Sequence, residues 1–209
     1  VQENPDFAPP LVRKMLEVFG YFTYPSDDHV GEYLSFAYEF TDLKWRYGLE
    51  ARSISEFEEA RKRRNWLEPY VSGEKPLDRR VTSPSGELAV PIVCDVELDR
   101  KIWRPAVNVL NTGLYVENLP KDSVVEVPAV VDAQGVHPVK VGPLPEALAA
   151  FTRTQVSIQK LLVEAYARRS KNLLLQALLL DPLVNSVSGA EKMLEDMLRL
   201  QSEFLPEFK

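Results

Sequence analysis

The residues whose types could do chemistry gather in one short segment, residues 26–33, with the sequence SDDHVGEY. The segment holds three carboxylates, an imidazole and a phenol, which are groups that can move protons. If a helix begins near His29, then Glu32 and Tyr33 lie on the same side of its first turn. The amino end of a helix favours negative charge, which suits Asp28 as a cap or an anionic ligand as a guest. A simple capping role for Ser and Asp before a helix explains the same pattern, so both interpretations stay open.

Other polar residues lie inside apolar patterns. Asparagine is disfavoured in strands, so Asn108, in a valine-rich segment, is expected to hydrogen-bond a definite partner. A turn or bulge explains Asn111 and Gly113. Arg153 interrupts an apolar helix pattern, and because buried polar groups need partners, both an internal network and a ligand contact remain open for it.

The histidines and the cysteine give no recognised metal-binding spacing. The chain has two histidines, His29 and His137, and a single cysteine, Cys94, which is expected to be a small buried thiol. The sequence contains no glycine-rich phosphate loop and no serine-hydrolase elbow. We therefore expect neither a complete metal site nor a nucleotide-binding fold in this chain.

The elements that must position these residues predict an α+β fold that is mainly helical with a small antiparallel sheet. In the first half, helices are expected over 10–19 and 29–40. A third, charged helix is expected to follow a capping box at Ser53 and Glu56 and to run to about Tyr70. A loop over 72–85 and a largely buried helix over 86–99 follow.

Three short valine-rich segments, 106–114, 123–131 and 136–141, predict a three-stranded antiparallel meander covered on both faces. A helix of roughly 20 residues from Pro145 and a heavily buried helix over 172–180 are expected next. Ser188 and Glu191 are expected to cap a last helix. Its apolar side chains are predicted to face the core: Met193, Met197, Leu200 and Phe204.

Composition limits the class of protein. The 209 residues are 45% hydrophobic and 27% charged, which is typical of a soluble globular protein of one domain, 1–209. The net charge of −6 argues against nucleic-acid binding, and the basic run 61–64 follows acidic residues and predicts a solvated, self-compensated face. No signal peptide or membrane-spanning run is present, so the chain is expected to be cytoplasmic and not to bind membranes.

Several segments, in order, resemble the carboxy-terminal region of family-four glycoside hydrolases. They are FGYF at 19–22 followed by the 26–34 segment ending EYL, NVLNTG at 108–113 through NLP at 118–120, VEVPA at 125–129, VGPLP at 141–145, RTQ at 153–155 and LLLDPL at 178–183. Each motif alone is weak, but together they span nearly the whole chain. The fold implied resembles the carboxy-terminal domain of lactate and malate dehydrogenase-like proteins.

The resemblance implies an unusual hydrolysis. In the family a bound NAD oxidises the sugar at C3, a tyrosine removes the acidified proton at C2, the glycosidic oxygen leaves, water adds and the hydride returns. A divalent metal, commonly Mn²⁺, polarises the oxygen at C3. The family's base corresponds to Tyr33, and because a phenol titrates near pH 10, it needs a nearby cation or metal. Substrate-binding roles are expected for Asp28, His29, Glu32 and Asn108.

The departures from the family pattern matter equally. The family's dinucleotide fingerprint and its Cys and His metal ligands belong to an amino-terminal Rossmann domain, which this sequence lacks, and Cys94 comes too late to replace that cysteine. The chain, which begins at Val1, is therefore expected to be inactive alone, to bind NAD or Mn²⁺ poorly, and to need the missing domain as partner. Homo-oligomers are usual in the family.

The wording of 27–33 is closer to members acting on unphosphorylated α-glucosides or α-galacturonides than to phosphoglucosidases. A non-catalytic interaction or scaffold domain that retains the fold is the alternative from another class. A dehydrogenase relative is a third possibility, against which the Glu32-Tyr33 pair argues.

Overall fold

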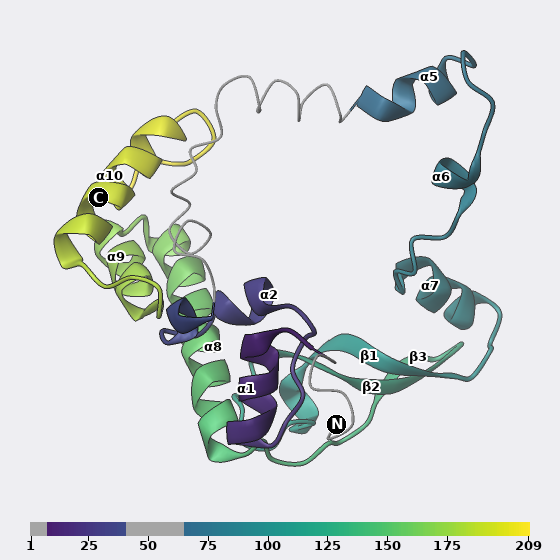
Figure 1. Ribbon diagram of the computed structural model, residues 1–209, viewed down its shortest axis with the longest axis horizontal. Coiled ribbons are helices and arrows are strands. Elements are labelled where there is room, and N and C mark those ends of the chain that lie inside the picture. The colour runs from purple at the N-terminus through teal and green to yellow at the C-terminus, as the bar shows by residue number, and fades with distance from the viewer. Residues whose placement is uncertain (1–7, 41–64) are drawn as a thin grey trace. The chain divides into compact units, whose positions relative to one another are not determined.

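The computed structural model describes residues 8–40 and 65–209 (Figure 1). Their contacts divide them into two compact units. The helical unit contains residues 8–40, 108–126 and 140–209, and the sheet unit contains residues 65–107 and 127–139. The assignment of residues 1–209 to one domain stays a prediction. The charged helix expected from Ser53 and the basic run 61–64 lie mainly outside the described residues.

The helical unit begins with α1 (Pro10–Phe19), as predicted. Proline at its first position lacks an N–H that would have no partner there, and Gly20 ends it with φ of 75°, a conformation that favours glycine. The N–H of Gly20 donates to the carbonyl of Leu16 at 3.0 Å. Leu11, Val12 and Met15 are buried and form the inner face of this helix.

The second predicted helix is wrong in length. Residues 29–40 do not form one helix: α2 spans Asp27–Gly31 and a 3-10 helix, η1, spans Ala37–Glu39. Between them the N–H of Tyr33 donates to Val30 O at 3.2 Å, a tight three-residue turn. The physical reason is the crowding of aromatic residues, which one helical face cannot bury. Breaking the helix buries Leu34 while leaving Tyr33 half exposed.

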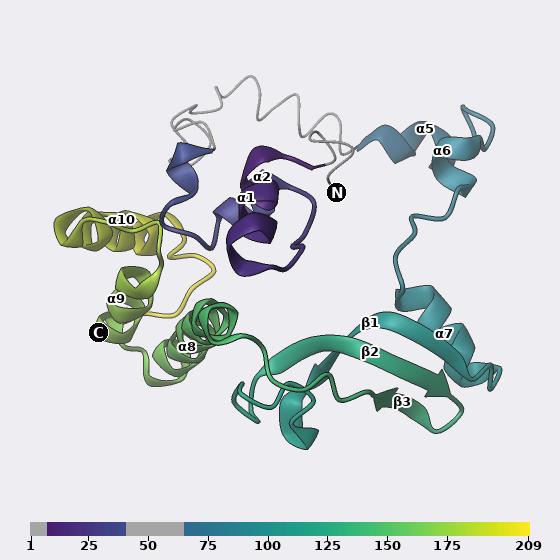
Figure 2. The ribbon, with the colours of Figure 1, turned by 60° about the horizontal axis from the view of Figure 1, so that its bottom comes forward.

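Three helices form the carboxy-terminal part of the helical unit. They are α8 (Glu146–Arg168), which confirms the long helix after Pro145, α9 (Lys171–Leu180) and α10 (Val187–Leu200). The middle helix, α9, packs against both α8 and α10 (Figure 2). The cap of α10 is Ser186, whose hydroxyl accepts the Gly189 N–H at 3.1 Å, and not Ser188 as expected.

Two burial expectations for these helices are wrong. In α9 only Ala177 is fully buried, and Leu179 and Leu180 are 40% and 45% exposed. The apolar residues expected to turn α10 toward the core are exposed: Met193, Met197, Leu200 and Phe204. The helix is amphipathic as predicted, but Ala190 is its buried residue, and Leu194 and Leu198 are partly buried. Amphipathic spacing shows that a helix has an apolar stripe, but it does not identify what covers the stripe.

The three-stranded sheet has the predicted order. Its strands are β1 (Ile102–Leu110), β2 (Val124–Asp132) and β3 (Gly135–Pro138), with β2 between the others and Asp132 opposite Gly135 in the antiparallel β2–β3 turn. The first strand begins and ends about four residues earlier than predicted. The expectation that both faces are covered is wrong, because burial alternates along β2: Val125 and Val127 are buried and Val124 is 62% exposed. Antiparallel sheets commonly leave one face open in this way.

The helices of the sheet unit are short. They are the 3-10 helix η2 (Asn65–Leu67), α5 (Glu68–Val71), α6 (Arg79–Thr82) and α7 (Ala89–Glu97). The expected loop over 72–85 therefore contains one helical turn. The helix expected over 86–99 is α7, but its predicted burial is wrong: Asp95 is its buried residue, whereas Val90 and Val93 are exposed and Cys94 is half-buried. Within the described ranges, none of the helices has the length and apolar character needed to cross a membrane.

Candidate functional site

A cavity of about 580 Å³ lies within the helical unit. It is formed by α1, by the segment from Thr23 to Leu34, and by the chain from Leu144 into the first turns of α8. We call it the Tyr33 cavity, and its described lining is Met15, Thr23, Tyr24, His29, Val30, Tyr33, Leu34, Leu144, Leu148, Phe151 and Thr152. Apolar side chains dominate, with two phenols, an imidazole and threonine hydroxyls among them, which is the usual character of a small-molecule site.

Two of the predicted site residues, His29 and Tyr33, meet in this cavity. The imidazole of His29 packs edge-on against the ring of Tyr24, with the ring centroids 5.0 Å apart and the planes at 77°. Tyr33 lies in the turn after α2 and is half exposed, so a ligand has access to its phenol. The sequence interpretation did not single out Tyr24 or Thr152. Their only signal was position, since each lies a few residues from the segments that resemble the family.

The other predicted site residues lie differently. Glu32 is exposed in the turn after α2, and Asn108 is exposed on β1; neither of them lines the Tyr33 cavity. Asp28 belongs to the backbone of α2, but its side chain lies outside the part that the structure describes. Because α2 has only five residues, it lacks the aligned dipoles that an anion site at a helix amino end requires. Substrate-binding roles for these three residues stay predictions.

Asp27 has a structural role that local sequence reasoning missed. Its two carboxylate oxygens accept the backbone N–H groups of Leu11 and Val12, each at 3.0 Å. These are unpaired donors of the first turn of α1, where Pro9 provides no side-chain cap. Asp27 therefore caps a helix that precedes it by some fifteen residues and ties α2 to the amino end of α1.

Replacing Asp27 by alanine is expected to lower the free energy of unfolding by about 1–2 kcal/mol, the usual cost of losing a helix cap. Asp27→Asn, which keeps one acceptor oxygen, should fall between the alanine variant and the wild type. Ser26→Ala is the matched control, because Ser26 bonds Val30 and Tyr24 through its backbone. Urea denaturation followed by circular dichroism measures the effect. Equal midpoints for Asp27→Ala and Ser26→Ala would contradict the capping role.

The hydrophobic core next to the cavity explains why these segments meet. The buried cluster includes Leu11, Met15, Val30 and Leu34, and partly buried Phe151 of α8 packs against it. The ring of Phe151 also lies edge-on to Phe19 and tilted against Phe36, at centroid distances of 5.7 Å and 6.4 Å. The cavity is thus walled on one side by α1 and α2 and on the other by the start of α8.

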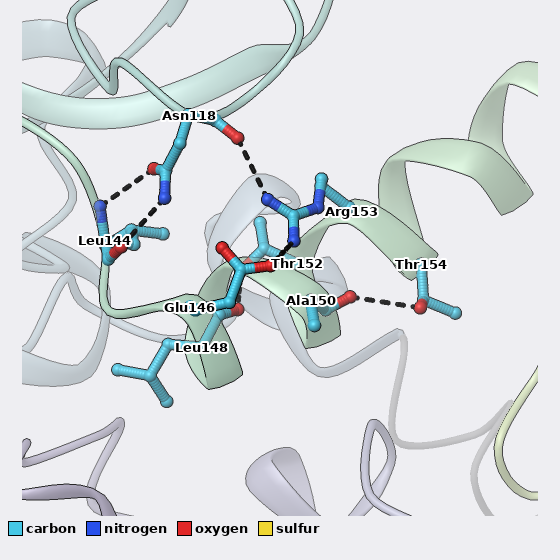
Figure 3. Close-up of polar contacts among 8 residues, drawn as sticks. All are labelled: Asn118, Leu144, Glu146, Leu148, Ala150, Thr152, Arg153 and Thr154. Carbon is cyan, nitrogen blue, oxygen red and sulfur yellow. Dashed lines mark hydrogen bonds and ion pairs between the residues drawn. The ribbon is translucent and has the colours of Figure 1, made fainter.

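Arg153, for which a network and a ligand contact were both open, takes part in an internal network (Figure 3). Its guanidinium donates to the backbone oxygen of Asn118 at 3.3 Å and pairs with the carboxylate of Glu146. Thr154, its neighbour on α8, bonds only the helix carbonyl of Ala150 at 3.1 Å. The structure therefore favours the internal network for Arg153.

The second histidine is paired on the β2–β3 hairpin of the sheet unit. His137 Nε2 lies 2.8 Å from the Asp132 carboxylate. The hydrogen bond from His137 is the main cause that lowers the pKa of Asp132, and the N–H of Gln134 adds to it. Among the described residues, no group of three His, Cys, Asp or Glu side chains could hold a metal ion. The described residues therefore do not fit a divalent metal such as Mn²⁺.

Comparison with known proteins gives the family. A model of the family 4 glycosyl hydrolase C-terminal domain matches residues 2–184. An alpha-galactosidase of Rhizobium meliloti is 30% identical over 208 residues, 93% of this chain and 41% of that protein. An alpha-glucosidase of Erwinia rhapontici is 29% identical over 195 residues, 93% of this chain and 39% of that protein.

Solved structures agree. A 6-phospho-alpha-glucosidase from gut microorganisms, in complex with NAD and Mn²⁺, aligns over 95% of this chain and 44% of its own, with a TM-score of 0.73 and 26% identity. A 6-phospho-beta glucosidase from Thermotoga maritima, with manganese, NAD⁺ and glucose-6-phosphate, aligns over 81% and 41%, with a TM-score of 0.66 and 28% identity. The chain spans about two fifths of the length of the relatives that it matches. Because the family model matches most of the sequence and the fold is shared, the chain belongs to the family 4 glycosyl hydrolases and corresponds to their C-terminal domain.

Proposed function

We propose that this chain is the substrate-side half of a glycosidase that hydrolyses O-glycosidic bonds by oxidation at C3 followed by elimination. The observation that carries the proposal is the position of Tyr33, accessible in a cavity that it shares with His29, within a family 4 chain. The apolar wall from Leu144 to Phe151 suits the C–H face of a sugar ring or an apolar aglycone. An α-glucoside or an α-galacturonide is the proposed substrate.

The role assigned to Tyr33 is that of the base. With a ketone at C3, the proton on C2 is acidic, and the Tyr33 phenolate takes it. The electron pair left at C2 forms a C1–C2 double bond while the C1–O bond breaks, and the leaving oxygen takes a proton from an acid. Water then adds to C1 and a proton returns to C2. The two-electron oxidation at C3 and its reversal would be supplied by NAD bound to an amino-terminal half, and no side chain described here is assigned to them.

Deuterium labelling tests this proposal. The chain would be mixed with a separately prepared amino-terminal NAD-binding half, NAD and Mn²⁺, and given aryl α-glucosides and α-galacturonides in D₂O. We expect release of the aryl alcohol with deuterium at C2 of the sugar, because the C2 proton is exchanged during elimination. The chain without that half is expected to be inactive. Hydrolysis without deuterium at C2 would contradict the elimination route.

A non-catalytic interaction domain remains the second candidate. The exposed apolar side chains of Met193, Met197 and Leu200 on α10 favour it, because contiguous exposed apolar surface commonly marks a contact with another protein. Absence of activity in every pairing, with the paired halves shown to associate, would support this candidate over the glycosidase. We also propose that the chain forms homo-oligomers through this surface and that it is cytoplasmic.

A further inference from the structure

The side chain of Asn118 makes a reciprocal pair of hydrogen bonds with the backbone of Leu144 (Figure 3). Its Nδ2 donates to the Leu144 carbonyl at 2.8 Å, and its Oδ1 accepts the Leu144 N–H at 2.9 Å. The amide thus replaces a neighbouring strand for one residue of the chain that leads into α8. Both bonds are part-buried, where leaving the backbone groups unpaired costs more than in water.

The same residue is connected to α8 a second time. The backbone oxygen of Asn118 accepts the Arg153 guanidinium at 3.3 Å, and Arg153 in turn pairs with Glu146 in the first turn of the helix. Leu144 and Arg153 lie on either side of the residues through which α8 lines the Tyr33 cavity, namely Leu148, Phe151 and Thr152. Asn118 therefore holds this wall of the cavity at both of its ends.

The loop that carries Asn118 is itself anchored. Asn111, fully buried at the start of the 3-10 helix η3 (Asn111–Gly113), donates to the carbonyls of Val116 and Leu119 at 2.9 Å and 3.1 Å. Its Oδ1 accepts the Val116 N–H at 3.1 Å. These contacts lie on both sides of Asn118 along the chain, so the loop is a fixed support. The turn expected at Asn111 is confirmed, and the Asn111 side chain anchors the loop that carries Asn118.

Within the described residues, the amino end of α8 lacks a side-chain cap. Pro145 is its N-cap residue and supplies no side-chain hydrogen bond to the first turn. The chain before α8 is held by two backbone bonds, from Val141 N–H to Tyr115 O at 2.8 Å and from Glu117 N–H to Gly142 O at 3.2 Å. Asn118 adds the side-chain bonds to Leu144, which lies nearest to the helix start. From this geometry we propose that Asn118 is a positioning residue of the Tyr33 cavity, setting the α8 wall against Tyr33 and thereby the affinity for the glycoside. The effect on glycoside affinity rests on the proposed function.

The first test is independent of activity. In Asn118→Leu both side-chain bonds are lost, and in Asn118→Asp the acceptor for the Leu144 N–H remains while the donor to the Leu144 carbonyl is lost. Amide hydrogen exchange of Leu144, measured by NMR on the 209-residue chain, is expected to be faster by about thirtyfold in Asn118→Leu, which loses two bonds of about 1 kcal/mol each. A smaller increase is expected in Asn118→Asp, which also serves if the leucine variant does not fold.

Thr154→Ala is the matched control, because Thr154 follows Arg153 on α8 yet bonds only within the helix. Exchange at Leu144 should be unchanged in this variant. Leu144 exchange at the wild-type rate in the folded Asn118 variants overturns the proposal. Equal acceleration in Thr154→Ala also overturns it, since any loosening of α8 would then suffice.

The second test uses the paired halves and aryl α-glycosides. A displaced wall weakens ground-state and transition-state binding alike, so both Asn118 variants are expected to raise KM about tenfold while kcat stays within about twofold. Faster Leu144 exchange with unchanged KM overturns the positioning role for substrate. If the wild-type pair shows no activity, the proposed function fails, and the exchange result alone then supports or overturns the positioning of the wall.

Discussion

Replacing Tyr33 by phenylalanine is expected to lower kcat for aryl α-glycoside cleavage by the paired halves by about two to four orders of magnitude, the range for a general base. The change removes one oxygen from an accessible ring that lines the cavity, so binding should change little. Incorporation of deuterium at C2 should fall in parallel with the cleavage rate. A loss confined to KM would assign Tyr33 to binding instead of proton transfer.

Tyr24→Phe is the control for this prediction. Tyr24 lines the same cavity and is likewise exposed, but its ring packs against His29 and its hydroxyl has no role in the proposed proton transfer. We expect its kcat to fall by less than about tenfold, as for a group outside the base role. If Tyr24→Phe were as slow as Tyr33→Phe, or if Tyr33→Phe kept full activity, Tyr33 would not be the base.

Replacing Arg104 by methionine is expected to reduce the free energy of unfolding of the sheet unit by about 3–5 kcal/mol, the cost of leaving a buried charge without its partner. Asp95 on α7 is fully buried, and its Oδ2 accepts the Nε and Nη2 of Arg104 at 2.6 Å and 2.5 Å. Its Oδ1 has no hydrogen-bond partner, so Arg104 supplies the main compensation for the carboxylate. This pair also ties α7 to β1.

Arg100 offers the matched comparison. Its guanidinium is 4.0 Å from Asp95 Oδ1 and its side chain is 48% exposed, so Arg100→Met is expected to cost less than about 1 kcal/mol. The double variant Asp95→Leu with Arg104→Met should recover much of the loss, because an apolar pair needs no desolvated charge. Urea denaturation of the wild type, the single variants Asp95→Leu and Arg104→Met, and the double variant gives the coupling energy of the pair. A loss in Arg104→Met no larger than that in Arg100→Met would contradict the central role of Arg104.

Interactions between near neighbours were the ones that sequence reasoning predicted well. Proline at the start and Gly20 at the end define α1 through backbone preferences, and Asp132 and Gly135 form the hairpin turn for the same reason. The long α8 follows from apolar spacing. The segment with His29 and Tyr33 was found from its residue types, the resemblance to the family gave the two residues their expected roles, and both line the cavity. All these features depend on residues within a few positions of one another.

Tertiary structure alone decided the partners across long separations. A carboxylate at the start of α2 predicts a cap for α2, yet Asp27 caps α1. The backbone donors of Leu11 and Val12 come within reach of Asp27 only when the chain folds back. The amide of Asn118 holds Leu144, a pairing for which sequence spacing offers no signal. Which side of α10 is buried likewise depends on what packs there, and periodicity cannot state it.

The sequence by itself thus determined the α+β class and most helices and strands, since these follow from local backbone preferences and apolar spacing. It also marked the segment that bears the proposed base, through its residue types and its resemblance to the family. The geometry that turns this segment into a site came from the tertiary structure. Separate segments meet around Tyr33 because a core cluster packs α1 and α2 against Phe151, and because Asp27 and Asn118 hold the walls. Hydrogen bonds between distant residues have strict distance and angle requirements, which only the folded chain satisfies.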